Sequence, residues 1–247
     1  MGLGGLFTAL FGNKTERMTS IFLSFAGGVM TSIVFLELIP ESIELGNLVI
    51  AIVGLTAGAV LVLILNNLMD MFTSAKKASK FHDSYAEFFH SSEIITRKKS
   101  MLRSGVIMLF AIGLHNIPEG LALGAAGYHD AKLGLALVII IGLHNIPEGM
   151  AVSAPLIAGG LSKVKSVLIT LSVGATTVIG AIIGVLIGGI SDIAVAVSFS
   201  IAGGSMLYVV FAELLPQSIV LSNNRVPTFF TLAGIIVGML FMHGFSV

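Results

Sequence analysis

The sequence has no cysteine, no tryptophan and few charged residues. Without cysteine, disulfide bonds and thiolate metal sites are excluded, so any metal would have to be held by nitrogen and oxygen ligands. Only 11% of the 247 residues are charged, whereas a soluble domain of this length needs far more polar surface. The low charge content therefore argues against an ordinary soluble protein.

Hydrophobic residues are abundant instead. They make up 55% of the chain, and the mean hydropathy is +1.02. Apolar runs long enough to cross about 30 Å of hydrocarbon recur along the sequence. The 29 glycines fit this interpretation, because small residues let membrane helices pack closely. We expect an all-α polytopic protein of the cell (plasma or inner) membrane.

The apolar runs predict seven full spans and one fragment. The fragment, residues 1–11, would form about 17 Å of helix, which is too short to span the bilayer. We therefore expect eight transmembrane segments, the first of them truncated, with Met1 inside a longer first span. The full spans are predicted at about residues 18–40, 47–72, 101–127, 131–157, 164–190, 193–220 and 226–247. This divides the chain into segments 1–3 (residues 1–72), a cytoplasmic loop (73–104), segments 4–5 (105–157) and segments 6–8 (158–247).

The basic residues give the orientation. All Lys and Arg except Lys132 fall in one set of alternate loops or at the ends of the adjoining spans. Because cytoplasmic loops are enriched in Lys and Arg, this asymmetry places the 73–104 loop in the cytoplasm.

Two segments of opposite direction share a motif. "FAGGVMTSIVFLELIPES" at residues 25–42 aligns with "IAGGSMLYVVFAELLPQS" at 201–218, and the alignment matches Glu37 with Glu213. The two "HNIPEG" segments, 115–120 and 144–149, are adjacent and also run in opposite directions. This pattern predicts a 3+2+3 inverted repeat, which is typical of alternating-access transporters.

Each HNIPEG copy places polar residues inside an apolar span. His and Glu are four residues apart and so share a helix face, while the proline should kink the helix and free backbone carbonyls. No Lys or Arg in these spans can neutralise the glutamates, and an unpaired carboxylate at mid-bilayer costs about 2.5 kcal/mol or more. Imidazole and carboxylate together suit Zn²⁺, Fe²⁺, Mn²⁺ or Co²⁺. We interpret the two copies as halves of one intramembrane metal site, with the candidate ligands His115, Asn116, Glu119, His144, Asn145 and Glu148.

Three other interpretations were weighed for these residues. Protonated glutamates could serve a proton relay without metal, and the polar residues could brace the kinks. An intramembrane metalloprotease would require an H-E-x-x-H motif, which neither copy has. We therefore expect a protein that is not an enzyme and has no prosthetic group.

The paired HNIPEG motifs, the eight-segment plan, the basic loop and the ELIPES/ELLPQS pair resemble the ZIP (Zrt/Irt-like) family of divalent-metal transporters, in its prokaryotic zinc-uptake branch. The resemblance implies alternating-access transport of zinc, with iron, manganese, cobalt or cadmium as further substrates, into the cytoplasm. It also implies that the six candidate ligands occupy the transport site between segments 4 and 5. A homodimer in the lipid bilayer is implied as well, and no nucleic-acid partner is expected. A metal-gated channel or sensor and a metal exporter are the alternatives.

Two further expectations accompany the resemblance. Many prokaryotic relatives carry a glutamate in segment 6 that helps bind a second metal, whereas Thr176 lies near that place here, which favours a single well-held ion. Glu37 and Glu213, each three residues before a proline, are possible accessory ligands on the ion path; a solvated or capping role near a helix end is the alternative.

Overall fold

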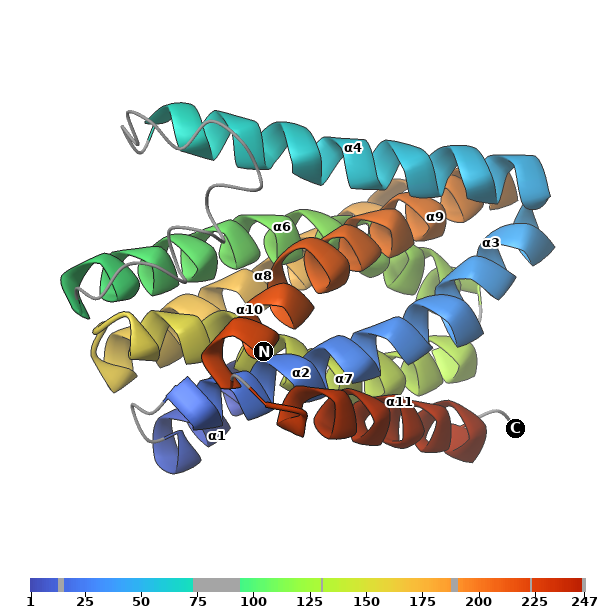
Figure 1. Cartoon of the computed structure of the whole chain (residues 1–247). Coiled ribbons are helices and arrows are strands. Elements are labelled where there is room, and N and C mark those ends of the chain that lie inside the picture. The colour runs from blue at the N-terminus through green and yellow to red at the C-terminus, as the bar shows by residue number, and fades with distance from the viewer. Residues whose placement is uncertain (13–15, 73–93, 130, 188–190, 223, 246–247) are drawn as a thin grey trace.

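The computed structural model describes residues 1–12, 16–72, 94–129, 131–187, 191–222 and 224–245. All secondary structure elements in these ranges are helical (Figure 1). The all-α prediction is thus confirmed for the described chain. The elements are α1 (Gly2–Phe11), α2 (Glu16–Ile33), η1 (Val34–Leu38), α3 (Ile39–Leu45), α4 (Leu48–Phe72), α6 (Ile94–His129), α7 (Ala131–Ala158), α8 (Lys163–Ile187), α9 (Asp192–Val209), η2 (Val210–Leu214), α10 (Leu215–Ser222) and α11 (Val226–Phe245).

The long helices coincide with the predicted spans. Six of the described stretches are long and apolar enough to cross a membrane, as expected for a multi-pass membrane protein. The helix α7 has the length of a span, with 28 residues, but is not among those six. The helix α1 has 10 residues and is too short to cross. The count of eight spans therefore stays a prediction for these two elements.

Two helices contain a π-helical turn that the sequence did not predict. In the continuous helix α2–η1–α3, the amide of Ile39 donates to the carbonyl of Val34, and in α9–η2–α10 that of Leu215 donates to Val210. A proline, Pro40 or Pro216, lies two residues after the end of each turn, and its missing N–H interrupts the α-helical hydrogen bonds. The two π turns occupy matching places in the aligned segments, so the structure preserves the repeat in detail.

The packing of the helices follows the inverted repeat. The helix α2 packs on α11, and its counterpart α9 packs on α4; likewise α6 packs on α8, and its counterpart α7 on α1. In Figure 1, α2–α3 runs from left to right and α9–α10 from right to left. The predicted inverted arrangement is therefore confirmed by both packing and direction.

The helices form two groups that meet along α6–α9 and α2–α7. One group contains α2, α4, α9 and α11, and the other contains α1, α6, α7 and α8. Glycines allow close approach within the first group: Gly28 of α2 faces the backbone carbonyl of Thr231, and its counterpart Gly204 faces that of Leu55. Close backbone contact of this kind stabilises helix pairs in a membrane.

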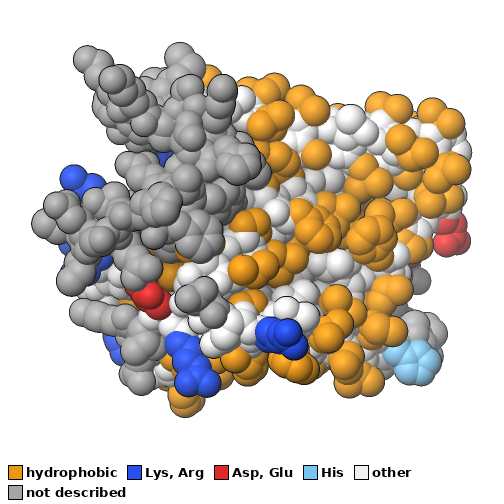
Figure 2. Space-filling view, viewed as in Figure 1, with side chains coloured by type: hydrophobic (Ala, Val, Ile, Leu, Met, Phe, Trp, Pro, Cys, Tyr) orange, Lys and Arg blue, Asp and Glu red, His pale blue; other side chains and the backbone are white. Residues whose placement is uncertain are grey.

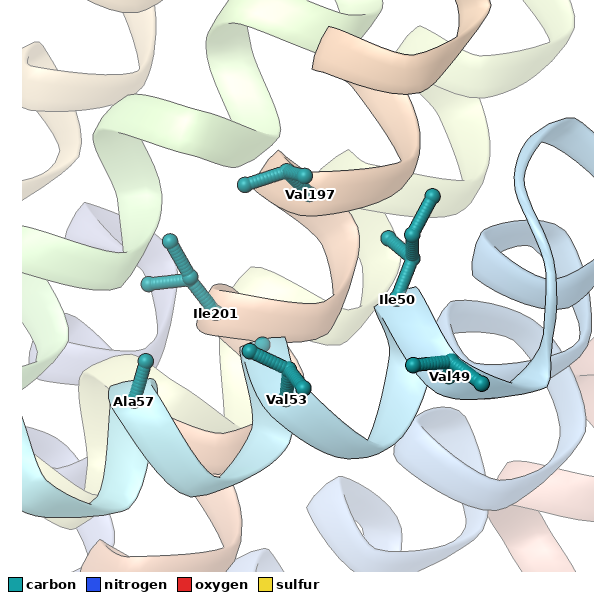
Figure 3. A pocket seen from close by; sticks show the side chains of 7 residues that line it. Val49, Ile50, Val53, Ala57, Val197 and Ile201 are labelled. Atoms are coloured by element: carbon teal, nitrogen blue, oxygen red, sulfur yellow. The ribbon is translucent and has the colours of Figure 1, made fainter.

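The outer surface is mostly apolar. Figure 2 shows hydrophobic side chains over much of the visible face, with Lys and Arg toward the left end and the lower edge. A shallow groove of about 240 Å³ lies between α4 and α9 and is lined by aliphatic residues such as Val49, Val53, Val197 and Ile201 (Figure 3). Since no titratable side chain lines this groove, it is not a candidate for the metal site.

Candidate metal centre

The helices α6 and α7 pack against each other and carry one HNIPEG copy each. Pro118 and Pro147 lie inside these helices, and both helices continue through their proline. Continuity keeps the His and Glu of one copy on the same helix face, one turn apart. The predicted kinks stay a prediction, but the predicted convergence of the two copies can be assessed from the side chains.

The two copies meet in reciprocal pairs. His115 Nε2 lies 3.0 Å from Glu148 Oε1, and His144 Nε2 lies 2.5 Å from Glu119 Oε1. Each histidine therefore pairs with the glutamate of the other helix. The pairing brings together four of the six predicted ligands, which come from segments of opposite direction.

These four side chains are almost completely enclosed. His115 is 1% exposed, Glu119 3%, His144 2% and Glu148 0%. Interactions between such groups are strong because little water screens them. The site is therefore buried inside the protein and is separate from the apolar surface that would face lipid.

Several atoms of the site have unused hydrogen-bonding capacity. Within the described chain, Oε2 of Glu119 and of Glu148 has no hydrogen-bond partner, and the same holds for Nδ1 of His115 and of His144. A buried polar atom without a partner costs about 1–3 kcal/mol. A bound cation would give the carboxylate oxygens the missing partner.

The two asparagines flank the pairs. Asn116 is fully buried, and its Nδ2 lies 3.5 Å from the carbonyl of Val173 in α8, while its Oδ1 has no partner. Asn145 is partly buried, and its Oδ1 is also without a partner in the described chain. Both amide oxygens thus have unused hydrogen-bonding capacity in the described chain, and their role as ligands stays a prediction.

The pairs do not form a closed metal site. Among the described residues, no three His, Asp or Glu side chains lie close enough together to hold an ion. Nitrogen and oxygen donors in this combination suit zinc and neighbouring divalent transition metals.

Glu37 and Glu213, the possible accessory ligands, have different surroundings. Glu37, in η1, has an unpartnered buried Oε2 and interacts electrostatically with His144 and Glu119. Glu213, in η2, accepts a hydrogen bond from Asn66 at 3.2 Å, and its carboxylate is stabilised by the charge of Arg103. Only Glu37 is thus coupled to the paired residues, although the sequence repeat suggested equivalent roles.

The helix α8 contributes no carboxylate to the site. Thr176 Oγ1 donates to the carbonyl of Val173 in its own helix at 2.6 Å, whereas Thr177 is buried and its Oγ1 has no partner in the described residues. The hydroxyl of Thr176, the residue that the sequence alignment indicated, therefore forms a hydrogen bond within its helix, whereas that of Thr177 has no hydrogen-bond partner in the described residues.

Comparison with known proteins gives a consistent result. The family model described as "ZIP Zinc transporter" matches residues 1–246. Three proteins named "Zinc transporter ZupT" are similar over nearly their whole length. The protein of Chlorobium chlorochromatii is 32% identical over 98% of this chain and 90% of its own, and that of Akkermansia muciniphila is 34% identical over the same shares. The protein of Corynebacterium glutamicum is 31% identical over 96% of this chain and 91% of its own.

Proposed function

The chain belongs to the ZIP zinc transporter family, and from this premise we propose that it carries zinc into the cytoplasm by alternating access through the paired HNIPEG site. It is a metal-ion transport protein of the bacterial plasma membrane and not an enzyme. The metalloprotease alternative is thereby set aside. The ion, the direction and the mechanism are the parts that we propose.

The reciprocal His–Glu pairs are the observation that carries the proposal. Two carboxylates are buried there with one oxygen each unpartnered, beside two imidazoles. Burying such groups is costly, and ionisable residues retained inside a membrane protein mark ion or proton paths. One cation could replace the two hydrogen bonds and be bound by all four side chains. When the two His–Glu hydrogen bonds form again, the cation would be released.

The donor set supports zinc as the cargo. Imidazole and carboxylate ligands are typical of zinc sites, and the similar proteins are named zinc transporters. Iron, manganese, cobalt and cadmium are substrates that the same donors would accept, because affinity order alone does not select among them. With no carboxylate in the described part of α8 near the pairs, we propose one ion per site.

The two helix groups support alternating access. The paired residues lie on α6 and α7, in one group, whereas α2 and α9 of the other group pack against these helices. Inverted repeats of this kind permit two equivalent packings that open to opposite sides. A movement of one group past the other would therefore expose the site alternately. Uptake is the direction that the resemblance to the prokaryotic zinc-uptake branch implies, whereas the basic loops indicate only which face of the protein is cytoplasmic.

Two residues outside the pairs receive roles from their surroundings. We propose Glu37 as an accessory ligand on the ion path, because it is coupled to His144 and Glu119. Glu213 interacts electrostatically with Arg103 and accepts a hydrogen bond from Asn66, which supports a structural role. The homodimer and the lipid environment implied by the family stay predictions.

The proposal is tested by zinc uptake into proteoliposomes that contain the purified protein and an internal zinc-sensitive dye. We expect saturable uptake by the native chain and a loss of at least about tenfold in Glu119→Ala and Glu148→Ala, because each removes a ligand. Leu114→Ala is the matched control, since Leu114 adjoins His115 but is 36% exposed. Gel filtration would check that each variant is folded.

Three results would contradict the proposal. Full zinc uptake in both Glu119→Ala and Glu148→Ala would show that the paired HNIPEG residues are not the transport site. A flux that rises linearly with zinc concentration would indicate a channel, and transport only out of the compartment equivalent to the cytoplasm would indicate an exporter.

A further inference from the structure

Three carboxylates follow one face of the helix that leads to the metal site. Glu37 lies in η1, while Glu41 and Glu44 lie in α3, at spacings of four and three residues. At about 100° per residue, these spacings keep all three within about 60° of one another around the helix. They extend over about 10 Å along the axis, from the end of α3 toward α6 and α7.

Each carboxylate of this series is coupled to the next. Glu44 interacts electrostatically with Glu41, Glu41 with Glu37, and Glu37 with Glu119. Exposure falls along the same path: Glu44 and Glu41 are exposed, Glu37 is partly buried and Glu119 is 3% exposed. The series therefore connects the outer end of α3 with the buried pairs.

The inner end of the series carries unused acceptors. Oε2 of Glu37 and Oε2 of Glu119 are buried and have no hydrogen-bond partner in the described part of the chain. In that part, no Lys or Arg forms an ion pair with the three glutamates of the helix. Like charges this close repel each other, and a cation moving between them would relieve that repulsion.

The inverted counterpart of this helix is different. Glu41 and Glu44 correspond to Gln217 and Val220, so only Glu213 keeps its charge. Gln217 accepts a hydrogen bond from Ser104 at 3.1 Å, and Glu213 interacts electrostatically with Arg103. The series of three carboxylates is therefore present on only one of the two matching helices.

We propose that Glu44, Glu41 and Glu37 form an entry track that captures a divalent cation at the outer surface and passes it to the paired His–Glu site. This inference rests on the proposed function and assigns a role to two residues, Glu41 and Glu44, that the site itself does not use. Carboxylates in a membrane segment face water or the protein interior rather than lipid. Several weak sites in series attract a cation without trapping it, and their negative potential raises the local cation concentration.

The first test measures the kinetics of zinc uptake in proteoliposomes. Glu41→Gln and Glu44→Gln should each raise KM about threefold to tenfold, with a larger effect in the double variant and with Vmax within twofold of the native value. The native KM should rise with ionic strength, and the double variant should lose most of this dependence. Glu16→Gln is the control, because Glu16 is an exposed acidic residue at the start of α2, the opposite end of the helix that carries the track.

The second test measures access from water and does not depend on transport. Since the chain has no cysteine, one introduced thiol is the only one present. A cationic, membrane-impermeant thiosulfonate added outside should modify Glu37→Cys and Glu41→Cys. It should leave Ile43→Cys largely unmodified, because Ile43 lies on another face of α3 and is an exposed apolar residue.

The two tests distinguish failure of the entry track from failure of the proposed zinc-uptake function. If KM of the double variant equals that of Glu16→Gln, or if Glu41→Cys is modified no faster than Ile43→Cys, the track is refuted even when the native chain takes up zinc. If the native chain takes up no zinc, the proposed function fails, and the labelling rates alone decide whether a water-filled acidic path leads inward.

Discussion

At the scale of single residues, the reciprocal pairs show what spacing can and cannot predict. The four-residue spacing correctly placed the His and Glu of each copy on one helix face. It could not show that His115 would pair with Glu148 rather than with Glu119, because that choice depends on how α6 and α7 are placed against each other. The same limit applies to Thr176 and Thr177, since only packing decides which hydroxyl keeps an intrahelical bond.

A double-mutant cycle tests the reciprocal pairing in the metal-free protein. We expect a coupling free energy of about 1 kcal/mol or more between His144 and Glu119, because loss of either partner leaves the other buried and unpaired. The pair His115 and Glu119, four residues apart on one helix, should show a much smaller coupling. Thermal unfolding in detergent of the single and double alanine variants gives both values, and equal couplings would contradict the observed pairing.

At the scale of the elements, hydropathy and charge predicted the helices because apolar length is the main requirement for crossing a bilayer. The π turns η1 and η2 were missed, although a proline two residues after each turn was visible in the sequence. A proline only signals that one helical hydrogen bond is absent. Whether the helix kinks or widens into a π turn depends on its neighbours.

Glycine packing gives a prediction for the element scale. A Cβ on Gly204 would meet the backbone of Leu55, including Leu55 Cα at 2.8 Å, whereas one on Gly142 meets nothing within 4 Å. Gly204→Ala should therefore destabilise the protein by about 1–3 kcal/mol through overpacking of α9 against α4. Gly142→Ala should be neutral or stabilise it by up to about 1 kcal/mol through higher helix propensity.

Melting temperatures of the Gly204→Ala and Gly142→Ala variants in one detergent test this prediction. A lower value for Gly204→Ala and an unchanged or higher value for Gly142→Ala are expected. Equal shifts in melting temperature would mean that α4 and α9 move apart at little cost to accept the added methyl group, which is inconsistent with close backbone contact between them.

At the scale of the whole molecule, the inverted repeat places the two HNIPEG copies against each other, and its two halves differ in the surroundings of their matching glutamates. The repeat could be predicted from Glu37 and Glu213, which match across segments 2 and 7. The different surroundings of these two glutamates could not be predicted, because Arg103 of α6 and Asn66 of α4, which interact with Glu213, are far from it in the sequence. The cytoplasmic loop predicted at 73–104 lies mostly outside the described residues, and α6 already begins at Ile94.

The central claim is that both HNIPEG copies hold one cargo ion together. A crystal structure of the zinc-soaked protein, with data collected on both sides of the zinc absorption edge, tests it most directly. We predict one strong anomalous peak per chain, bound by side chains of both copies, with His115, Glu119, His144 and Glu148 as the core of its ligand set. A peak elsewhere, two peaks that each touch only one copy, or two fully occupied ions bridged by the glutamates would contradict this account.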